Sequence, residues 1–154
     1  MEDVLSVASY IYKRYKEQFS APMTEMKLHK LLYFTQREAI IQTGQPMFEE
    51  PFLAWRYGPI VMKVRQAFSS MDSLSGLSEV AIQTYKSVFD MVFNTLADKD
   101  AWSLSRLTHA EYSWQHAREG LAPDANCDRV ITMDDIRKDA DRIRLHRVLV
   151  SARK

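Results

Sequence analysis

Apolar residues recur at helical spacing over most of this chain. Between Asp3 and Phe19 they return every three to four positions, and charged residues occupy the other side, which predicts a surface amphipathic helix. Ser20-Ala21-Pro22 interrupts this pattern. Thr24 is then a good N-cap for a second helix, which we expect to run to about Ile41.

The second helix has no clean polar face. Leu31, Leu32 and Tyr33 lie at its centre, and apolar residues cover most of its circumference, which is typical of a buried helix. Gly44 suits a left-handed C-terminal cap, and Pro46 prevents the helix from resuming. We therefore expect the rest of the chain to pack around this segment.

The stretch from Phe48 to Tyr57 is short, aromatic and bounded by prolines, which predicts an extended segment or a small hairpin. Gly58-Pro59 then breaks the pattern. Because proline favours the first turn of a helix, we expect a third helix to begin at Pro59.

The second half of the chain shows four further helical patterns. Ser78 opens a stripe of about five turns that reaches Leu96, and a shorter helix is expected near Ala101 to Leu107. Thr108-His109-Ala110-Glu111 has the form of a capping box for another short helix, and Thr132 caps the last one. The pattern predicts a mainly α, single compact domain over residues 1–154, with about six to seven helices.

Composition and charge narrow the class of protein. The formal net charge is +1, so no whole-molecule field attracts nucleic acid, which is a disfavoured partner. The single cysteine, Cys127, excludes an internal disulfide and suits a reducing cytoplasm. The first residues are acidic, and no apolar run approaches the ~18 residues needed to span a bilayer. We expect a cytoplasmic protein with no membrane partner.

No local motif for catalysis, cofactor binding or metal binding is present. The chain lacks G-x-S-x-G, G-x-x-x-x-G-K-[ST] and G-x-G-x-x-G motifs. His109 and His116 are seven residues apart, whereas chelation of zinc from one helix needs a spacing near three or four. The sequence therefore predicts no catalytic residue, no cofactor and no metal ligand.

A partner-binding surface has two candidate locations. Lys27, Lys30 and Arg37 lie with Phe34 on one side of the second helix, where cations beside aromatics suit protein or phosphate binding. The alternative is that the stems of these cations lie along the core with solvated heads.

The second location is Ala54 to Pro59. Trp55, Arg56 and Tyr57 are residue types enriched at interface hot spots. The alternative places Trp55 inward against the second helix, with Gly58 and Pro59 setting a turn, which leaves Arg56 and Tyr57 as the contact residues.

The motifs in this order resemble those of a known family. They are Lys27 to Phe34, Gly44-Gln45-Pro46 with Phe48, Ala54 to Val61, and Leu107-Thr108-His109 with Trp114 and Ala117-Arg118. Together they are similar to the Panacea domain of SocA-like antitoxins, whose members include phage-associated GepA-like proteins. The resemblance covers roughly Val4 to Ala140. The motif positions that it marks as structural are Leu31, Leu32, Tyr33, Trp55, Gly58, Pro59, His109 and Trp114.

The resemblance implies an antitoxin of a two-gene toxin-antitoxin pair, often carried by prophages or mobile elements. Its partner would be a cognate protein toxin, neutralised by direct binding. The SocA branch is described instead as an adaptor that delivers its toxin to a cytoplasmic protease. No catalytic residue or cofactor is implied. A nucleic-acid-binding regulator of its own operon is a further alternative, and homodimer formation is left open.

Overall fold

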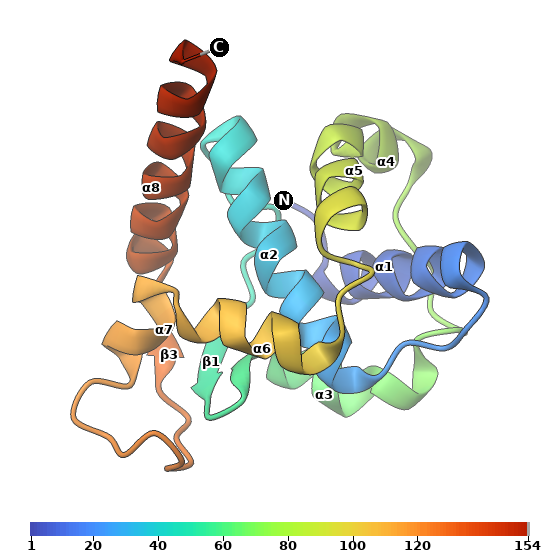
Figure 1. The fold of residues 1–154 in the computed structure, drawn as a ribbon. Helices are drawn as coiled ribbons and strands as arrows, with labels where there is room; N and C mark the ends of the chain where they lie inside the picture. The colour runs from blue at the N-terminus through green and yellow to red at the C-terminus, as the bar shows by residue number, and fades with distance from the viewer. Residues whose placement is uncertain (154) are drawn as a thin grey trace.

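The computed structural model describes residues 1–153 and shows a mainly helical fold, as predicted (Figure 1). Lys154, the last residue of the predicted domain, lies outside the described residues. The described part contains eight α-helices, a single 3-10 turn and three short strands. The helices are α1 (Val4–Phe19), α2 (Glu25–Thr43), α3 (Met62–Ala67), α4 (Glu79–Thr84), α5 (Lys86–Thr95), α6 (Ala101–His109), α7 (Tyr112–Ala117) and α8 (Met133–Ala152), and the 3-10 turn spans Phe68–Ser70.

Helix α2 is the centre of the fold, which confirms the prediction of a buried helix. It contacts α1, α5, α6 and α8 along its length, and in Figure 1 it passes between α8 and α5. The Thr24 hydroxyl caps its N-terminus by accepting from the Lys27 N–H, and Gly44 ends it with a φ of 78°. Leu31, Leu32 and Tyr33 are fully buried. Burial of one such side chain contributes roughly 1.5–3 kcal/mol, so α2 stabilises the core along most of its length.

The three strands form a small antiparallel sheet in the order β2-β1-β3. The strands are β1 (Phe52–Trp55), β2 (Gly58–Ile60) and β3 (Val130–Ile131). Of the two predicted alternatives the structure shows the hairpin, which spans residues 52–60 rather than 48–57, and the prediction that a helix begins at Pro59 is wrong. Pro59 lies in β2 opposite Ala54, and α3 begins at Met62. Proline is tolerated there because β2 is an edge strand, where a missing N–H costs no ladder bond.

The pattern from Ser78 to Leu96 forms two helices rather than the predicted one. Tyr85 leaves the helical conformation, with a φ of −105° and a ψ of 15°, and separates α4 from α5. The apolar stripe continues across this break, because Ala81 in α4 and Phe89 in α5 are both buried. The spacing of hydrophobic residues therefore predicted the buried face correctly but did not predict the helix break at Tyr85.

The predicted capping box at Thr108 is also wrong. Thr108 lies in the last turn of α6, and its hydroxyl donates to the Ser105 carbonyl at 2.7 Å. Helix α7 is capped instead from α8, because the Asp139 carboxylate accepts from the N–H groups of Tyr112 (3.0 Å) and Ser113 (2.8 Å). A tertiary carboxylate thus does what the sequence suggested a local hydroxyl would do.

The last helix, α8, packs on α2 and begins at the predicted cap, Thr132, whose hydroxyl accepts from the Asp135 N–H. Its C-terminal end extends past the end of α2 in Figure 1. Within residues 1–153, every helix is too short or too polar to cross a lipid bilayer.

Candidate partner-binding surface at the hairpin

The turn of the β1–β2 hairpin consists of Arg56, which is half-buried, and Tyr57, which is exposed. Trp55 pairs with Gly58, so these two residues alone form the connection between the strands. Gly58 has a φ of 121°, a conformation that residues with a side chain rarely adopt. A Cβ atom at this position would also lie 2.7 Å from Thr108 Oγ1 and 2.8 Å from Lys30 Cε. Glycine therefore permits both the turn and the close approach of α2 and α6 to the hairpin.

Side chains from the C-terminal half of the chain hold the hairpin backbone in place. Trp114 Nε1 donates to the carbonyl of Trp55 at 2.8 Å, and Ser105 Oγ donates to the carbonyl of Tyr57 at 2.6 Å. Arg118 donates to the carbonyl of Ala54 at 2.8 Å. These bonds leave little freedom for the turn, so its exposed side chains start from a rigid base.

Trp55 does not point into the core, in contrast to the predicted inward orientation. The strand alternates, so that Phe52 and Ala54 are buried while Trp55 lies half-buried on the opposite face. Its Nε1 donates to Asp128 at 3.0 Å, and the Arg65 guanidinium lies 5.0 Å from its ring centroid. A period of two along the strand decides this orientation.

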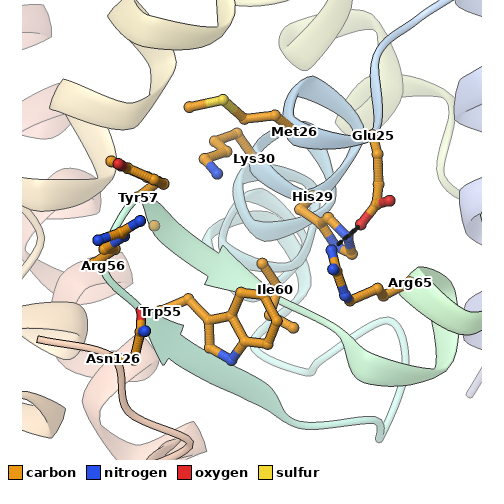
Figure 2. A pocket seen from close by; sticks show the side chains of 11 residues that line it. Glu25, Met26, His29, Lys30, Trp55, Arg56, Tyr57, Ile60, Arg65 and Asn126 are labelled. Carbon is orange, nitrogen blue, oxygen red and sulfur yellow. Dashed lines mark hydrogen bonds and ion pairs between the residues drawn. The ribbon is translucent and has the colours of Figure 1, made fainter.

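Trp55 forms one wall of a cleft of about 360 Å³ between the hairpin and the N-terminal half of α2 (Figure 2). We name it the Lys30 cleft, after the cation that lies between its walls. Its lining residues are Glu25, Met26, His29, Lys30, Trp55, Arg56, Tyr57, Gly58, Ile60, Arg65 and Asn126.

Lys30 is 2% exposed, and among residues 1–153 its ammonium has no hydrogen-bond or ion-pair partner. Figure 2 shows the ammonium directed toward the space beside Tyr57 and Arg56. Burial lowers the pKa of Lys30 to about 8, while the Glu25 carboxylate acts in the opposite direction. The ammonium is unpaired but solvent still reaches it through the cleft, because Arg37 Nε is the only fully buried side-chain nitrogen or oxygen without a hydrogen-bond partner among residues 1–153.

The other ionisable groups of α2 in the Lys30 cleft are already paired. Glu25 accepts from Arg65 at 3.0 Å and lies 3.0 Å from His29 Nε2. His29 Nδ1 accepts from the Val61 N–H at 3.2 Å, so the neutral ring donates through Nε2 to Glu25. Burial lowers the pKa of His29 to about 4, against a smaller opposite effect of Glu25. The carboxylate in the cleft is thus committed to its own neighbours.

A second cleft of about 280 Å³ lies on the other side of Arg56 and includes Tyr57, Trp102 and Arg106 in its lining. Tyr57 and Trp102 are 45% and 56% exposed and meet edge to face, with ring centroids 5.4 Å apart. The Arg56 guanidinium lies 4.6 Å from the Tyr57 ring centroid. An exposed aromatic pair flanked by arginines has the composition of a protein interface core.

The structure separates the five residues predicted to bind a partner. Lys27 is buried, and its Nζ donates to the Tyr15 hydroxyl at 3.1 Å. Arg37 ion-pairs with Glu111 at 2.6 Å. These two cations stabilise contacts between helices. The alternative prediction, that their charged groups are solvated, is also wrong for both. Lys30, Arg56 and Tyr57 come together at the Lys30 cleft.

The structural motif positions in the second half of the chain support the same hairpin. His109 stacks on Trp114 with ring centroids 4.2 Å apart, and Trp114 holds the Trp55 carbonyl. Trp102 was missed by sequence reasoning. The buried face of α6 contains Leu104, Ser105 and Thr108. Trp102 lies outside this face, and an exposed tryptophan on a helix could have indicated a binding surface.

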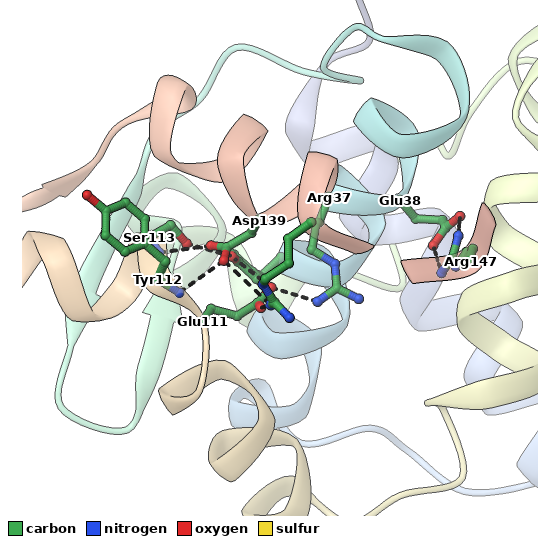
Figure 3. A network of polar contacts seen from close by, with 9 residues as sticks. Arg37, Glu38, Glu111, Tyr112, Ser113, Asp139 and Arg147 are labelled. Atoms are coloured by element: carbon green, nitrogen blue, oxygen red, sulfur yellow. Dashed lines mark hydrogen bonds and ion pairs between the residues drawn. The ribbon is translucent and has the colours of Figure 1, made fainter. Parts of the chain in front are cut away.

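A buried polar network links α7 to α2 and to α8 (Figure 3). The Tyr33 hydroxyl lies 2.7 Å from Ser113 Oγ and donates to Glu111 at 3.2 Å. Burial, together with the carboxylates of Glu111 and Asp139, raises the pKa of Tyr33 well above its ordinary value. Because α7 supplies Trp114, this network positions the hairpin indirectly.

The end of α8 carries a second exposed apolar surface. Leu145, Val148 and Leu149 are exposed and follow helical spacing in the C-terminal part of α8. Among residues 1–153, no group of three or more His, Cys, Asp or Glu side chains is arranged to hold a metal ion.

Comparison with known proteins identifies related sequences. The family model described as "Antitoxin SocA-like, Panacea domain" matches residues 28–115, which include most of α2, the hairpin, α6 and the start of α7. The chain is 28% identical over 152 residues to Antitoxin SocA of Caulobacter vibrioides, and the alignment covers 84% of this chain and 77% of that protein. No solved structure gives a significant match.

Proposed function

Because the chain belongs to the SocA-like antitoxin family, we propose that it is an antitoxin that neutralises a cognate protein toxin by direct binding. The observation that supports direct binding is the exposed Tyr57–Trp102 pair, with Arg56 between the two clefts. Aromatic and arginine side chains dominate the energetics of protein interfaces when a partner covers them. The hairpin turn is thus the proposed centre of the toxin-binding surface.

The rigidity of this surface also supports a binding role. Three backbone carbonyls of the hairpin accept hydrogen bonds from Trp114, Ser105 and Arg118. A turn fixed before binding pays less entropy when a partner immobilises it. The same bonds leave the side chains of Arg56 and Tyr57 available for contact.

The test is co-expression with the product of the adjacent gene. Wild-type protein should restore growth to cells that express this product and should co-purify with it. The variant Tyr57→Ala/Trp102→Ala should bind at least about tenfold more weakly, because hot-spot truncations cost 2 kcal/mol or more. Binding is measured by calorimetry or biolayer interferometry on the purified proteins.

Tyr112→Ala is the matched control for this experiment. Tyr112 is 41% exposed and stacks on His116, but it lines neither cleft. Its variant should bind the toxin like wild type. If the adjacent product is harmless and does not co-purify, the antitoxin function is wrong. If the double variant binds normally, only the placement of the surface is wrong.

The two alternative functions, a protease adaptor and a regulator of its own operon, are tested in the same strains. An adaptor that delivers the toxin to a cytoplasmic protease would shorten the half-life of the toxin, whereas masking leaves its amount unchanged. A regulator of its own operon would shift upstream DNA in a salt-sensitive way. The proposed setting, a prophage or mobile element in which a toxin gene adjoins this one, is checked by sequencing the flanking genes.

The proposal extends to the whole chain. Helices α1 and α8 lie outside residues 28–115 and yet pack on α2, which supports a single domain over residues 1–154. The cytoplasm is its proposed location. The exposed leucines at the end of α8 offer a surface for a second copy of the chain. Light scattering on the purified protein tests this homodimer.

A further inference from the structure

We propose that the Lys30 cleft receives the carboxylate of an Asp or Glu side chain of the toxin, an inference that rests on the proposed function. The argument starts from Lys30, which is 2% exposed and has no partner among residues 1–153. Buried charges in folded proteins are normally paired, because desolvation of a lone ion is costly. An anion supplied from outside would complete this pair.

The remaining groups of the cleft favour an anion over a cation or a neutral group. The guanidinium of Arg56 also lines the cleft and has no carboxylate partner within residues 1–153. Glu25 is held by Arg65 and His29 and does not neutralise the ammonium by direct contact. Two free cations therefore face one small space.

The walls of the cleft favour a carboxylate of a protein over a phosphate. Met26, Ile60 and the rings of Trp55 and Tyr57 give the cleft an apolar and aromatic lining (Figure 2). Phosphate sites normally add several backbone N–H groups from a glycine-rich loop or helix start. The first turn of α2 is already capped by Thr24 and carries Glu25, which repels phosphate. A single carboxylate on an aliphatic stem matches both the charge and the walls.

The position of the cleft connects it to the proposed interface. Arg56 and Tyr57 line both the Lys30 cleft and the neighbouring cleft with Trp102. A toxin segment that covers the aromatic pair would thus have the Lys30 ammonium directly beside it. One acidic side chain inserted there would be desolvated and fully paired, which is the condition under which a charge contact governs dissociation.

The experiment compares Lys30→Met with Lys27→Met in binding to the purified product of the adjacent gene. Methionine keeps the unbranched stem and removes the charge. Lys30→Met should weaken binding at least tenfold while its melting temperature stays equal to or above that of wild type. Lys27 is a buried lysine on the same helix, but its Nζ bonds Tyr15 away from the cleft, so Lys27→Met should leave affinity unchanged.

The acidic partner is then located on the toxin. Each Asp and Glu of the toxin is replaced by its amide, and one replacement should cost affinity with wild type but add no further loss with Lys30→Met. Arg56→Gln provides a second variant at the exposed turn in case Lys30→Met fails to fold, and it should also weaken binding.

The outcomes separate the two proposals. If wild type does not bind the toxin, the proposed function falls, and this inference falls with it. If wild type binds but Lys30→Met and Arg56→Gln bind equally well, the function stands and the carboxylate site is wrong. Stabilisation of wild type by millimolar inorganic phosphate or ATP, lost in Lys30→Met, would overturn the carboxylate in favour of a phosphate ligand.

Discussion

Two cations of α2, Arg37 and Lys30, have opposite surroundings. Near its C-terminal end, Arg37 pairs with Glu111 at 2.6 Å, and Arg147 from α8 meets Glu38 through two contacts of 2.8 Å (Figure 3). Near its N-terminal end, Lys30 has no such partner within residues 1–153. The ion pairs of Arg37 and Arg147 join helices, whereas the ammonium of Lys30 lies beside the cleft without a counter-ion.

This difference suggests that the paired cations of α2 stabilise the fold and that the unpaired cation binds a partner. Burial alone would raise the pKa of Glu38, but hydrogen bonds from Arg147 and Gln42 outweigh it, and the pKa is lowered. The pair is therefore satisfied within the fold. For Lys30 burial dominates, and its pKa is lowered because the fold supplies no directly bonded carboxylate. The paired end should lose stability when it is altered, and the unpaired end should lose affinity.

Breaking the paired end should have the largest effect. Glu111→Gln removes the charge that Arg37 and Arg142 share and weakens the contact to Tyr33. Removal of one partner from a buried ion pair costs about 3–5 kcal/mol, so the free energy of unfolding should fall by that amount. Urea denaturation measures it, with the exposed Glu119→Gln as control. A loss below about 1 kcal/mol would show that the network does not stabilise the fold.

Acid should have the next largest effect, through His29 at the hairpin end. Its pKa is about 4 in the folded protein and about 6.5 when unfolded, so the unfolded chain binds more protons between these values. Stability is therefore full above pH 6.5 and is lost as pH falls toward 4. Between pH 7 and 5 wild type should lose about 2 kcal/mol more than His29→Gln does. Equal losses of stability in the two proteins would contradict a neutral His29 ring that makes two hydrogen bonds.

The smallest expected effect is a gain of stability in alkali, and it tests whether Lys30 is unpaired. The folded pKa of about 8 lies below the ordinary 10.5, so the unfolded chain binds more protons between these values. Stability should rise with pH in this window, by about 1 kcal/mol between pH 7 and 9 relative to Lys30→Met. The charged groups near Lys30 are Glu25, Arg56 and Arg65, and the titratable His109 also faces it with a pKa that burial lowers.

Denaturation of wild type and Lys30→Met at matched pH values provides the measurement. Parallel pH profiles would show that the Lys30 ammonium is solvated or paired in the free protein. That result would contradict the difference in charge pairing between Arg37 and Lys30.

Periodicity and local capping chemistry predicted much of the fold. The apolar circumference of α2, the Thr24 cap and the Gly44 terminus follow from neighbours in sequence, and all three are confirmed. The wrong predictions concern Thr108, Pro59 and Tyr85, and for the cap of α7 a contact with a distant segment decided the local structure. Asp139 replaced the predicted cap of α7 from 27 residues away.

The candidate site was predictable in part. Arg56 and Tyr57 were expected to contact a partner because of their residue types, and they occupy the turn of the hairpin. Lys27, Lys30 and Arg37 were equivalent in the sequence, as cations on one side of a helix. Their different environments depend on Tyr15, the hairpin and Glu111, which belong to three separate elements.

The sequence by itself determined a mainly helical chain, a buried central helix and a short extended or hairpin segment with cationic and aromatic residues, because these features depend on spacing within a few residues. Only the tertiary structure decided which cations are paired. Arg37 meets a carboxylate 74 positions away, while the hairpin closes over Lys30 without supplying one. Charge pairing depends on distances in space, and for Lys30 those distances leave room for a partner outside the chain.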